Sequence, residues 1–213
     1  MKSKYTIITL AILISISIIL LGFKLTIFNE NTYKDQFTRY NIYNSFQEKE
    51  LNQNLTLLLN YLKNNNQDLK TNFFNQKEKT HLSDVKSIIK NLTSLLYSLL
   101  IIILISFSYL IYNEKYKTIR KSLILGSIIT ILIILIFYTL TLINFDKIFL
   151  YFHLISFSNN LWLLNPETDN LIKMFPQDIF LNITTIAIIK SLIISIIILI
   201  LSLINHKKTF KTS

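Results

Sequence analysis

Four long apolar runs dominate the hydrophobic pattern of this chain. Residues 5–23, 91–113 and 122–145 carry no charged side chain, and Lys190 is the single charge in the fourth run, 179–205. A bilayer core roughly 30 Å thick is crossed by about 20 helical residues, so each run is long enough to span it. Lipid admits only helices and closed barrels, and the runs lack the alternation of barrel strands. They therefore predict transmembrane helices.

The predicted fold is an all-α membrane protein with one domain over residues 1–213. An extracytoplasmic cap built from two exterior segments covers one end of its four spans. The spans are expected at residues 5–27, 88–112, 123–145 and 179–205. The exterior segments are 28–84 and 146–178, and the cytoplasmic parts are 113–122 and the tail 206–213.

The orientation follows from the basic residues beside the spans. Segments 1–4, 113–122 and 206–213 together hold nine basic residues and the single acid Glu114, whereas 146–178 holds two lysines and four acids. The basic residues are Lys2, Lys4, Lys115, Lys117, Arg120, Lys121, Lys207, Lys208 and Lys211. Basic flanks stay in the cytoplasm, so both termini are expected there. The many Lys, Asn and Ile residues, with only two Gly and two Pro, indicate the biased coding of an AT-rich bacterial genome, so the membrane is expected to be a bacterial cytoplasmic membrane.

Charge and cysteine content exclude several classes of protein. The net charge of +10 does not indicate nucleic-acid binding, because the basic residues flank spans and form no stripe that alternates with aromatic residues. The first span is expected to be a retained anchor, since no small-x-small cleavage site follows it. With no cysteine in the chain, disulfides, thiolate catalysis and cysteine-ligated metals are excluded.

Leucines at helical spacing lie in the first exterior segment and predict an amphipathic helix, either on the membrane surface or capping the bundle. They are Leu51, Leu55, Leu58, Leu59 and Leu62. A loop is expected over residues 64–68, and short strands could occur elsewhere in 28–90.

Candidate chemistry begins with His81, just before the second span. Ser83 or Asp84 is a natural N-cap for that helix, which would put His81 ahead of a helix N-terminus. The partial positive charge there disfavours imidazolium, and a neutral imidazole can act as a general base. A surface histidine near a capping box is the alternative.

The second exterior segment carries a polar group in an apolar stretch. If it begins as a helix, His153, Ser156 and Asn160 share one face. Polar groups at membrane depth are expensive unless they are paired or functional. Trp162 fits an interfacial aromatic belt, and His206 fits a cytoplasmic flank.

Lys190 allows two interpretations. It could be a lysine that extends toward the membrane surface, or a partner for a lipid carbonyl or an acidic side chain in the bundle.

The motifs that begin at His81 (HLSDVK) and at Phe152 (FH, then FSNNLW, NPETDNLI and FP) together resemble the bacterial lipoprotein intramolecular transacylase (Lit) family. The resemblance implies an enzyme that moves the sn-2 acyl chain of an S-diacylglyceryl cysteine to the free amine of that cysteine, giving a lyso-form lipoprotein. It implies His81 and His153 as the catalytic pair and the diacylated lipoprotein N-terminus as substrate, with no metal or cofactor.

The residues suit that chemistry, since the substrate amine is itself the nucleophile. Two imidazoles can supply a base and an acid, and Asn160 or backbone amides can stabilise an oxyanion. Asp84, Ser156, Trp162, Asp169 and Lys190 are the further candidates for substrate-binding or supporting residues.

Two alternatives stay open. A metal-dependent membrane hydrolase could use His81, His153, Asp84 and Asp169 as ligands. A small transporter subunit or structural membrane protein, with Lys190 lining a polar path, would need no catalytic group.

Overall fold

The computed structural model describes residues 2–64 and 67–204, and within them every regular element is a helix. The short strands allowed for the first exterior segment are absent from those residues. Asn65 and Asn66 of the expected loop, and the predicted tail 206–213 with His206, lie outside the described residues.

Four helices are long and apolar enough to cross a membrane, which confirms the predicted fold class. They are α1 (Lys2–Ile27), α4 (Gln76–Tyr112), α5 (Tyr116–Ser156) and α7 (Gln177–Leu203). Large apolar side chains such as Leu104, Ile143 and Leu201 point outward and are 64–74% exposed. Outward apolar faces of this kind are suited to contact with lipid.

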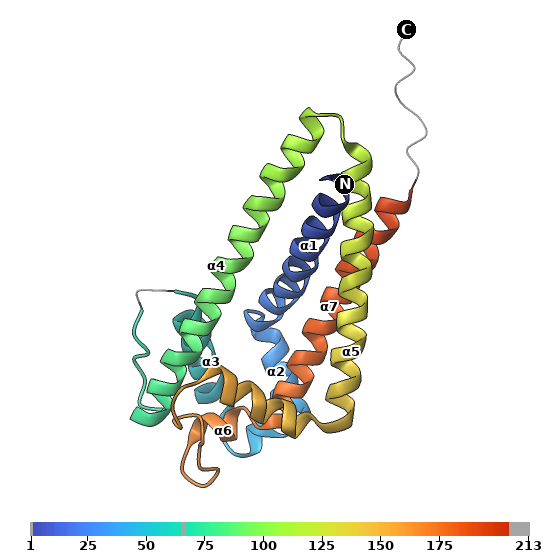
Figure 1. Ribbon diagram of the computed structural model, residues 1–213. Coiled ribbons are helices and arrows are strands. Elements are labelled where there is room, and N and C mark those ends of the chain that lie inside the picture. The colour runs from blue at the N-terminus through green and yellow to red at the C-terminus, as the bar shows by residue number, and fades with distance from the viewer. Residues whose placement is uncertain (1, 65–66, 205–213) are drawn as a thin grey trace.

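Small residues bring the bundle helices close together. α1 packs against α4, α5 and α7 (Figure 1). At Gly22 of α1, an added Cβ would lie 2.0 Å from Ser191 Oγ and 2.8 Å from the Ala187 carbonyl oxygen of α7. Ser195 of α7 donates a 2.9 Å hydrogen bond to the Ser127 carbonyl of α5. Membrane helices associate through such close approaches, because lipid offers no hydrophobic driving force between them.

Shorter helices form a cap at the end of the bundle that lies away from the N-terminus (Figure 1). They are α2 (Glu30–Arg39), the 3-10 helix η1 (Ile42–Asn44), α3 (Glu48–Lys63) and α6 (Asn170–Met174). The predicted amphipathic helix is α3, with Leu51 and Leu55 fully buried against a core that includes Phe37, Phe74 and Met174. The apolar face of α3 thus packs on the cap core.

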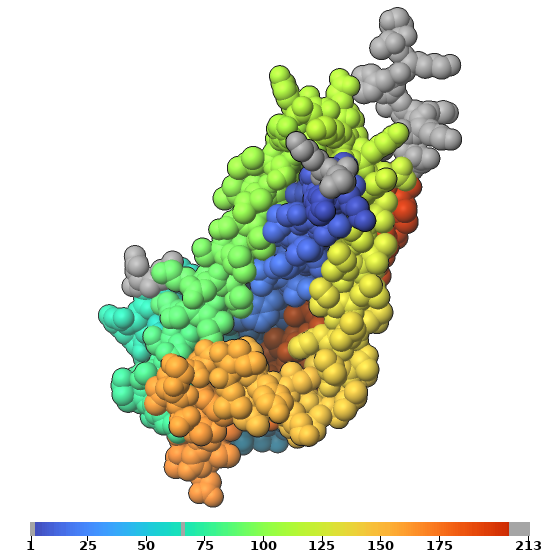
Figure 2. Space-filling view, in the orientation of Figure 1, coloured from blue at the N-terminus to red at the C-terminus, as the bar shows by residue number. Residues whose placement is uncertain are grey.

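α5 turns sharply at Asn144, whose backbone is extended (φ −161°, ψ 85°). The Asn144 side chain accepts a hydrogen bond from the Lys147 backbone N–H, so it caps a new helical segment, 145–156. This segment crosses the end of the bundle toward α4 (Figure 1). In Figure 2 α1 is visible between α4 and α5, and the orange segment that follows the turn covers the lower end of that opening.

Candidate active site

The start of α4 differs from the expectation that Ser83 or Asp84 caps it. Asn75 is the N-cap, and it forms a reciprocal capping box with Glu78. Asn75 Oδ1 accepts from the Glu78 N–H at 3.0 Å, and the Asn75 N–H donates to Glu78 Oε2 at 2.6 Å. This pairing satisfies two helix-end N–H donors at once, so the helix begins at Gln76. His81 therefore lies inside the second turn of α4 and not ahead of its N-terminus.

Glu78 also fixes the neighbouring chain segment. It is 1% exposed, and its Oε1 accepts a hydrogen bond from the Leu171 backbone N–H of α6. Sequence reasoning missed this residue, although the N-x-x-E spacing at Asn75 and Glu78 is a recognised capping signal.

Asp169 is buried in the same connection and holds it to α4. Its Oδ1 accepts from the Asn75 side chain at 2.9 Å and from the Thr168 hydroxyl at 3.1 Å, and its Oδ2 accepts from the Asn165 backbone N–H at 2.8 Å. Burial alone would raise the pKa of the Asp169 carboxyl, but these hydrogen bonds more than offset it and the pKa lies below the ordinary value. These bonds anchor segment 165–169 beside the start of α4.

The two histidines of the sequence motifs lie next to each other. Their ring centroids are 6.3 Å apart with 29° between the planes, and both side chains are buried. His81 comes from the second turn of α4, and His153 comes from the segment after the Asn144 turn. The turn in α5 thus brings together two residues that lie far apart in the sequence.

Hydrogen bonding distinguishes the two rings. His153 Nδ1 lies 2.7 Å from the Phe149 carbonyl oxygen, which can only accept, so Nδ1 carries the hydrogen and neutral His153 keeps its lone pair on Nε2. His81 Nδ1 is buried and has no hydrogen-bond partner among the residues that the structure describes. A buried donor or acceptor without a partner is uncommon in proteins and is often found where a ligand binds.

Aromatic side chains enclose His153. Phe149 and Phe152 lie 4.4 Å and 5.3 Å from its ring centroid, and Trp162 lies 4.9 Å away at 34°. Phe157 contacts both histidines, with its ring centroid 4.9 Å from that of His81 and 5.6 Å from that of His153. Trp162, which the sequence predicts for an interfacial belt, therefore contacts His153 directly.

A hydrogen bond between Asp84 and Asn159 links the two segments of the chain that supply the histidines. Asn159 Nδ2 donates to Asp84 Oδ2 at 2.9 Å, and Asn159 Oδ1 accepts from the Leu161 backbone N–H at 3.0 Å. Asp84 is one turn after His81 on α4, and Asn159 follows the end of α5. Sequence reasoning missed Asn159, because its partner is 75 positions away.

The expected shared face of His153, Ser156 and Asn160 is not formed. α5 ends at Ser156, and Asn160 lies in the following turn with an exposed side chain. Ser156 is half-buried at the last position of the helix. The break at Phe157 ends the helical periodicity on which the shared face depended.

Lys190 lies outside this site. Its Nζ donates a 2.9 Å hydrogen bond to the Leu25 carbonyl oxygen, in the last turn of α1. The last four carbonyls of a helix lack intrahelical partners, so Lys190 satisfies one of them from α7. Its partner is thus a backbone carbonyl, which neither sequence interpretation included.

The ligand set of the metal-dependent alternative does not come together. Within residues 2–64 and 67–204, no three His, Asp or Glu side chains are grouped so that they could hold a metal ion. Asp169 is occupied by the hydrogen bonds that anchor the cap. The arrangement that is present can accept and donate protons through two adjacent imidazoles in a partly apolar enclosure.

A family model and several solved structures are similar to this chain. The family model described as lipoprotein intramolecular transacylase Lit matches residues 8–180. The structure of membrane-integral Lit from Bacillus cereus superposes with a TM-score of 0.83 at 26% identity, covering 94% of each chain. Variants of that enzyme with a histidine replaced by arginine or by alanine give TM-scores of 0.80 at 26% identity, covering 94% of this chain and 90% or 92% of theirs. No curated protein matches the sequence significantly.

Proposed function

Because this chain belongs to the lipoprotein intramolecular transacylase Lit family, we propose that it moves the sn-2 acyl chain of an S-diacylglyceryl cysteine to the free α-amine of the same cysteine. The product is an N-acyl, S-monoacylglyceryl lipoprotein. The chain is a multi-pass membrane acyltransferase by its family and its four spans. The observation that carries the proposed acyl transfer is the nearness of the His81 and His153 rings, whose centroids are 6.3 Å apart.

The reaction moves one proton from nitrogen to oxygen. The neutral amine attacks the ester carbonyl, the C–N bond forms, and the ester C–O bond to glycerol breaks. A base must take the proton that the nitrogen loses, and an acid must protonate the departing glycerol oxygen. Amine and ester belong to one lipid headgroup, so the attack is intramolecular and proximity lowers the barrier.

The hydrogen bond to Phe149 supports His153 as the base. With Nδ1–H directed at that carbonyl, Nε2 carries the lone pair, and the same carbonyl stabilises the imidazolium that forms. The proton then passes from His153 to His81, and His81 donates it to the departing glycerol oxygen, so that both rings end neutral, as they began. Asn160, exposed in the turn after α5, and backbone amides are the proposed donors to the tetrahedral oxyanion.

We further propose that the histidine end of the bundle faces the outside. The described basic residues Lys4, Lys115 and Arg120 lie at the other end, as the positive-inside rule requires of the cytoplasmic side. Labelling intact cells at single introduced cysteines tests this orientation. Glu167→Cys should react with an impermeant reagent and Lys115→Cys should not, and the reverse pattern would refute the orientation.

The decisive experiment compares two synthetic lipopeptides with the purified protein. A diacylglyceryl lipopeptide with a free amine should become the lyso form, with or without a chelator, as read by mass spectrometry. The N-acetylated lipopeptide should be inert, because its nitrogen cannot attack. Hydrolysis of the blocked lipopeptide that stops on chelation would instead favour the metal-dependent hydrolase, and no turnover of either would favour the transporter or structural role.

A further inference from the structure

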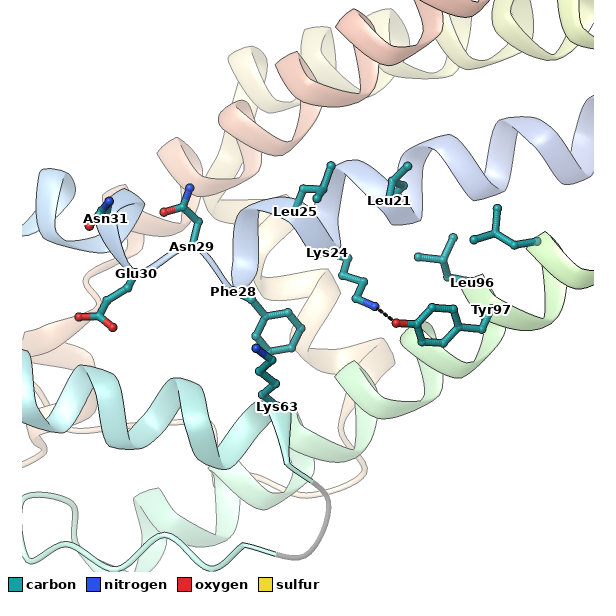
Figure 3. Close-up of a pocket in the computed structure, with 11 residues that line it drawn as sticks. Leu21, Lys24, Leu25, Phe28, Asn29, Glu30, Asn31, Lys63, Leu96 and Tyr97 are labelled. Atoms are coloured by element: carbon teal, nitrogen blue, oxygen red, sulfur yellow. Dashed lines mark hydrogen bonds between the residues drawn. The ribbon is translucent and has the colours of Figure 1, made fainter.

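A pocket lined by both charged and apolar side chains lies on a different side of α4 from the histidine pair. It has a volume of about 630 Å³ and is formed where α1, α2, α3 and α4 meet (Figure 3). Tyr97 of α4 lines it, 16 residues after His81. That spacing is roughly 24 Å along a helix and about 160° around it, so the pocket and the histidine pair are separate sites.

The pocket is basic. Lys24 donates to the Tyr97 hydroxyl, and its Nζ is 4.1 Å from the centre of the Tyr97 ring. Lys63 extends from the end of α3 toward the pocket (Figure 3), and no ion pair or hydrogen bond to another described residue engages its amine. Lys24 on α1 and Lys63 on α3 thus line the same cavity from two different helices.

The single acid that lines the pocket is already paired. Glu30 forms a 2.6 Å ion pair with Lys34 and accepts a hydrogen bond from the Thr56 hydroxyl at 3.2 Å. Its charge is therefore balanced outside the pocket, and Lys24 and Lys63 leave a net positive charge inside it.

The pocket lies beside the last turn of α1, which contains Lys24. Lys24 is 20 residues along α1 from Lys4, about 30 Å along the helix axis, so it lies near the far end of that span. Leu21 lies one turn before Lys24 on α1, and Leu100 lies one turn after Tyr97 on α4. Both leucines line the pocket, on the side nearer the middle of the two helices. Basic groups at the end of a spanning helix, with leucines one turn further into it, match the headgroup and acyl chain of a phospholipid.

We propose that this pocket binds an anionic glycerophospholipid, with the phosphate between Lys24 and Lys63 and one acyl chain along Leu21 and Leu100. Ammonium groups bind phosphate through charge-assisted hydrogen bonds, and Tyr97 can add a hydroxyl donor. Each lysine near a headgroup contributes on the order of 1 kcal/mol, which is roughly fivefold in affinity. The site is independent of the proposed transacylase reaction.

Native mass spectrometry of the detergent-purified full chain tests this proposal. Dioleoyl phosphatidylglycerol should bind more tightly than dioleoyl phosphatidylcholine. Lys24→Gln and Lys63→Gln should each weaken phosphatidylglycerol binding by roughly fivefold, and the double variant should lose the preference. Lys147→Gln, an exposed lysine of α5 at the same end of the bundle, is the matched control and should keep it. Equal binding of the two lipids, or an equal loss in Lys147→Gln, would overturn the proposal.

Two further arms complete the test. Inorganic phosphate at the lipid concentration should not displace phosphatidylglycerol, and displacement would mean a free-phosphate site and overturn the lipid assignment. Lys63 is exposed at the end of α3, so Lys63→Gln should fold even if the double variant does not. Wild-type affinity in folded Lys63→Gln, checked by its melting temperature, would also refute the proposal.

Discussion

The imidazole rings of His81 and His153 lie nearly parallel, with 6.3 Å between centroids and 29° between planes. Phe157 contacts both rings and holds them in one enclosure. One ring belongs to the continuous helix α4 and the other to the segment that follows the turn at Asn144. Two groups that must exchange a proton are thus positioned by different elements and share one wall.

Replacing either histidine should abolish most of the activity. His81→Ala and His153→Ala should each lower turnover of the free-amine lipopeptide by at least about a hundredfold, the usual worth of a positioned acid or base. The double variant should lose little more than the worse single variant, because members of one proton relay are not additive. Mass spectrometry of the lipopeptide gives the rate, and His206→Ala is the control expected to stay near wild type.

Two results would contradict this pairing. If both single variants retain more than half of the wild-type rate at unchanged expression, the histidine pair is not catalytic. If one variant alone is impaired, the other histidine binds or orients the substrate and does not transfer a proton.

The bond between Asp84 and Asn159 should position the turn after His153. A hydrogen bond to a charged group is worth about 1.5–3 kcal/mol, so Asn159→Ala should lower kcat by roughly tenfold or more with a smaller change in KM. Asp84→Ala and Asn159→Ala should be non-additive in a double-mutant cycle. The exposed neighbour Ser158→Ala should leave kcat unchanged, and additive effects in the cycle would show that the two side chains act independently.

The cap should weaken in acid because of Asp169. A carboxyl whose pKa is lowered in the folded state stabilises it above the ordinary value of about 3.9, and this contribution disappears as the pH falls through the lowered pKa. Hydrogen exchange of residues 165–171 should therefore be faster in Asp169→Asn than in wild type at pH 7, with the difference vanishing at low pH. Glu167→Gln, an exposed neighbour, should show no such difference, and a gap between wild type and Asp169→Asn that persists in acid would contradict this role.

Position 22 should not tolerate even the single extra carbon of alanine. Its Cβ would lie 2.8 Å from a backbone carbonyl of α7, which cannot rotate away as the Ser191 hydroxyl can. Overpacking of this kind typically costs about 1–3 kcal/mol, so Gly22→Ala should lower the melting temperature in detergent. Ile105→Ala, at a lipid-facing position that is 64% exposed, should change it less. An unchanged melting temperature in Gly22→Ala would show that α1 and α7 can separate freely.

The spans could be predicted from the sequence because hydrophobicity alone specifies them, whereas the site depends on contacts between distant segments. The prediction that α4 begins near Ser83 or Asp84 is wrong, because the capping box of Asn75 and Glu78 begins the helix earlier and leaves those two residues in its interior. The nearness of the histidines followed from a family resemblance and not from periodicity, since it requires the turn at Asn144. No local sequence pattern indicates the partners of Asn159 and Lys190. The partner of Asn159 is 75 positions away in the sequence, and the partner of Lys190 is a backbone carbonyl, which any residue carries.

The continuity of α4 has a mechanical consequence for the position of His81. α4 has 37 residues and is roughly 55 Å long, so a small change in the tilt of this helix within the bilayer produces a large displacement at its ends. His81 lies about 24 Å beyond Tyr97, so a rotation of about 5° near that residue displaces the imidazole by roughly 2 Å. His153 is joined to its own span through the turn at Asn144, but Phe157 and the bond between Asn159 and Asp84 tie its segment to α4. These contacts therefore keep the two rings together when α4 tilts, which matters because a misplacement of about 1 Å is enough to slow catalysis.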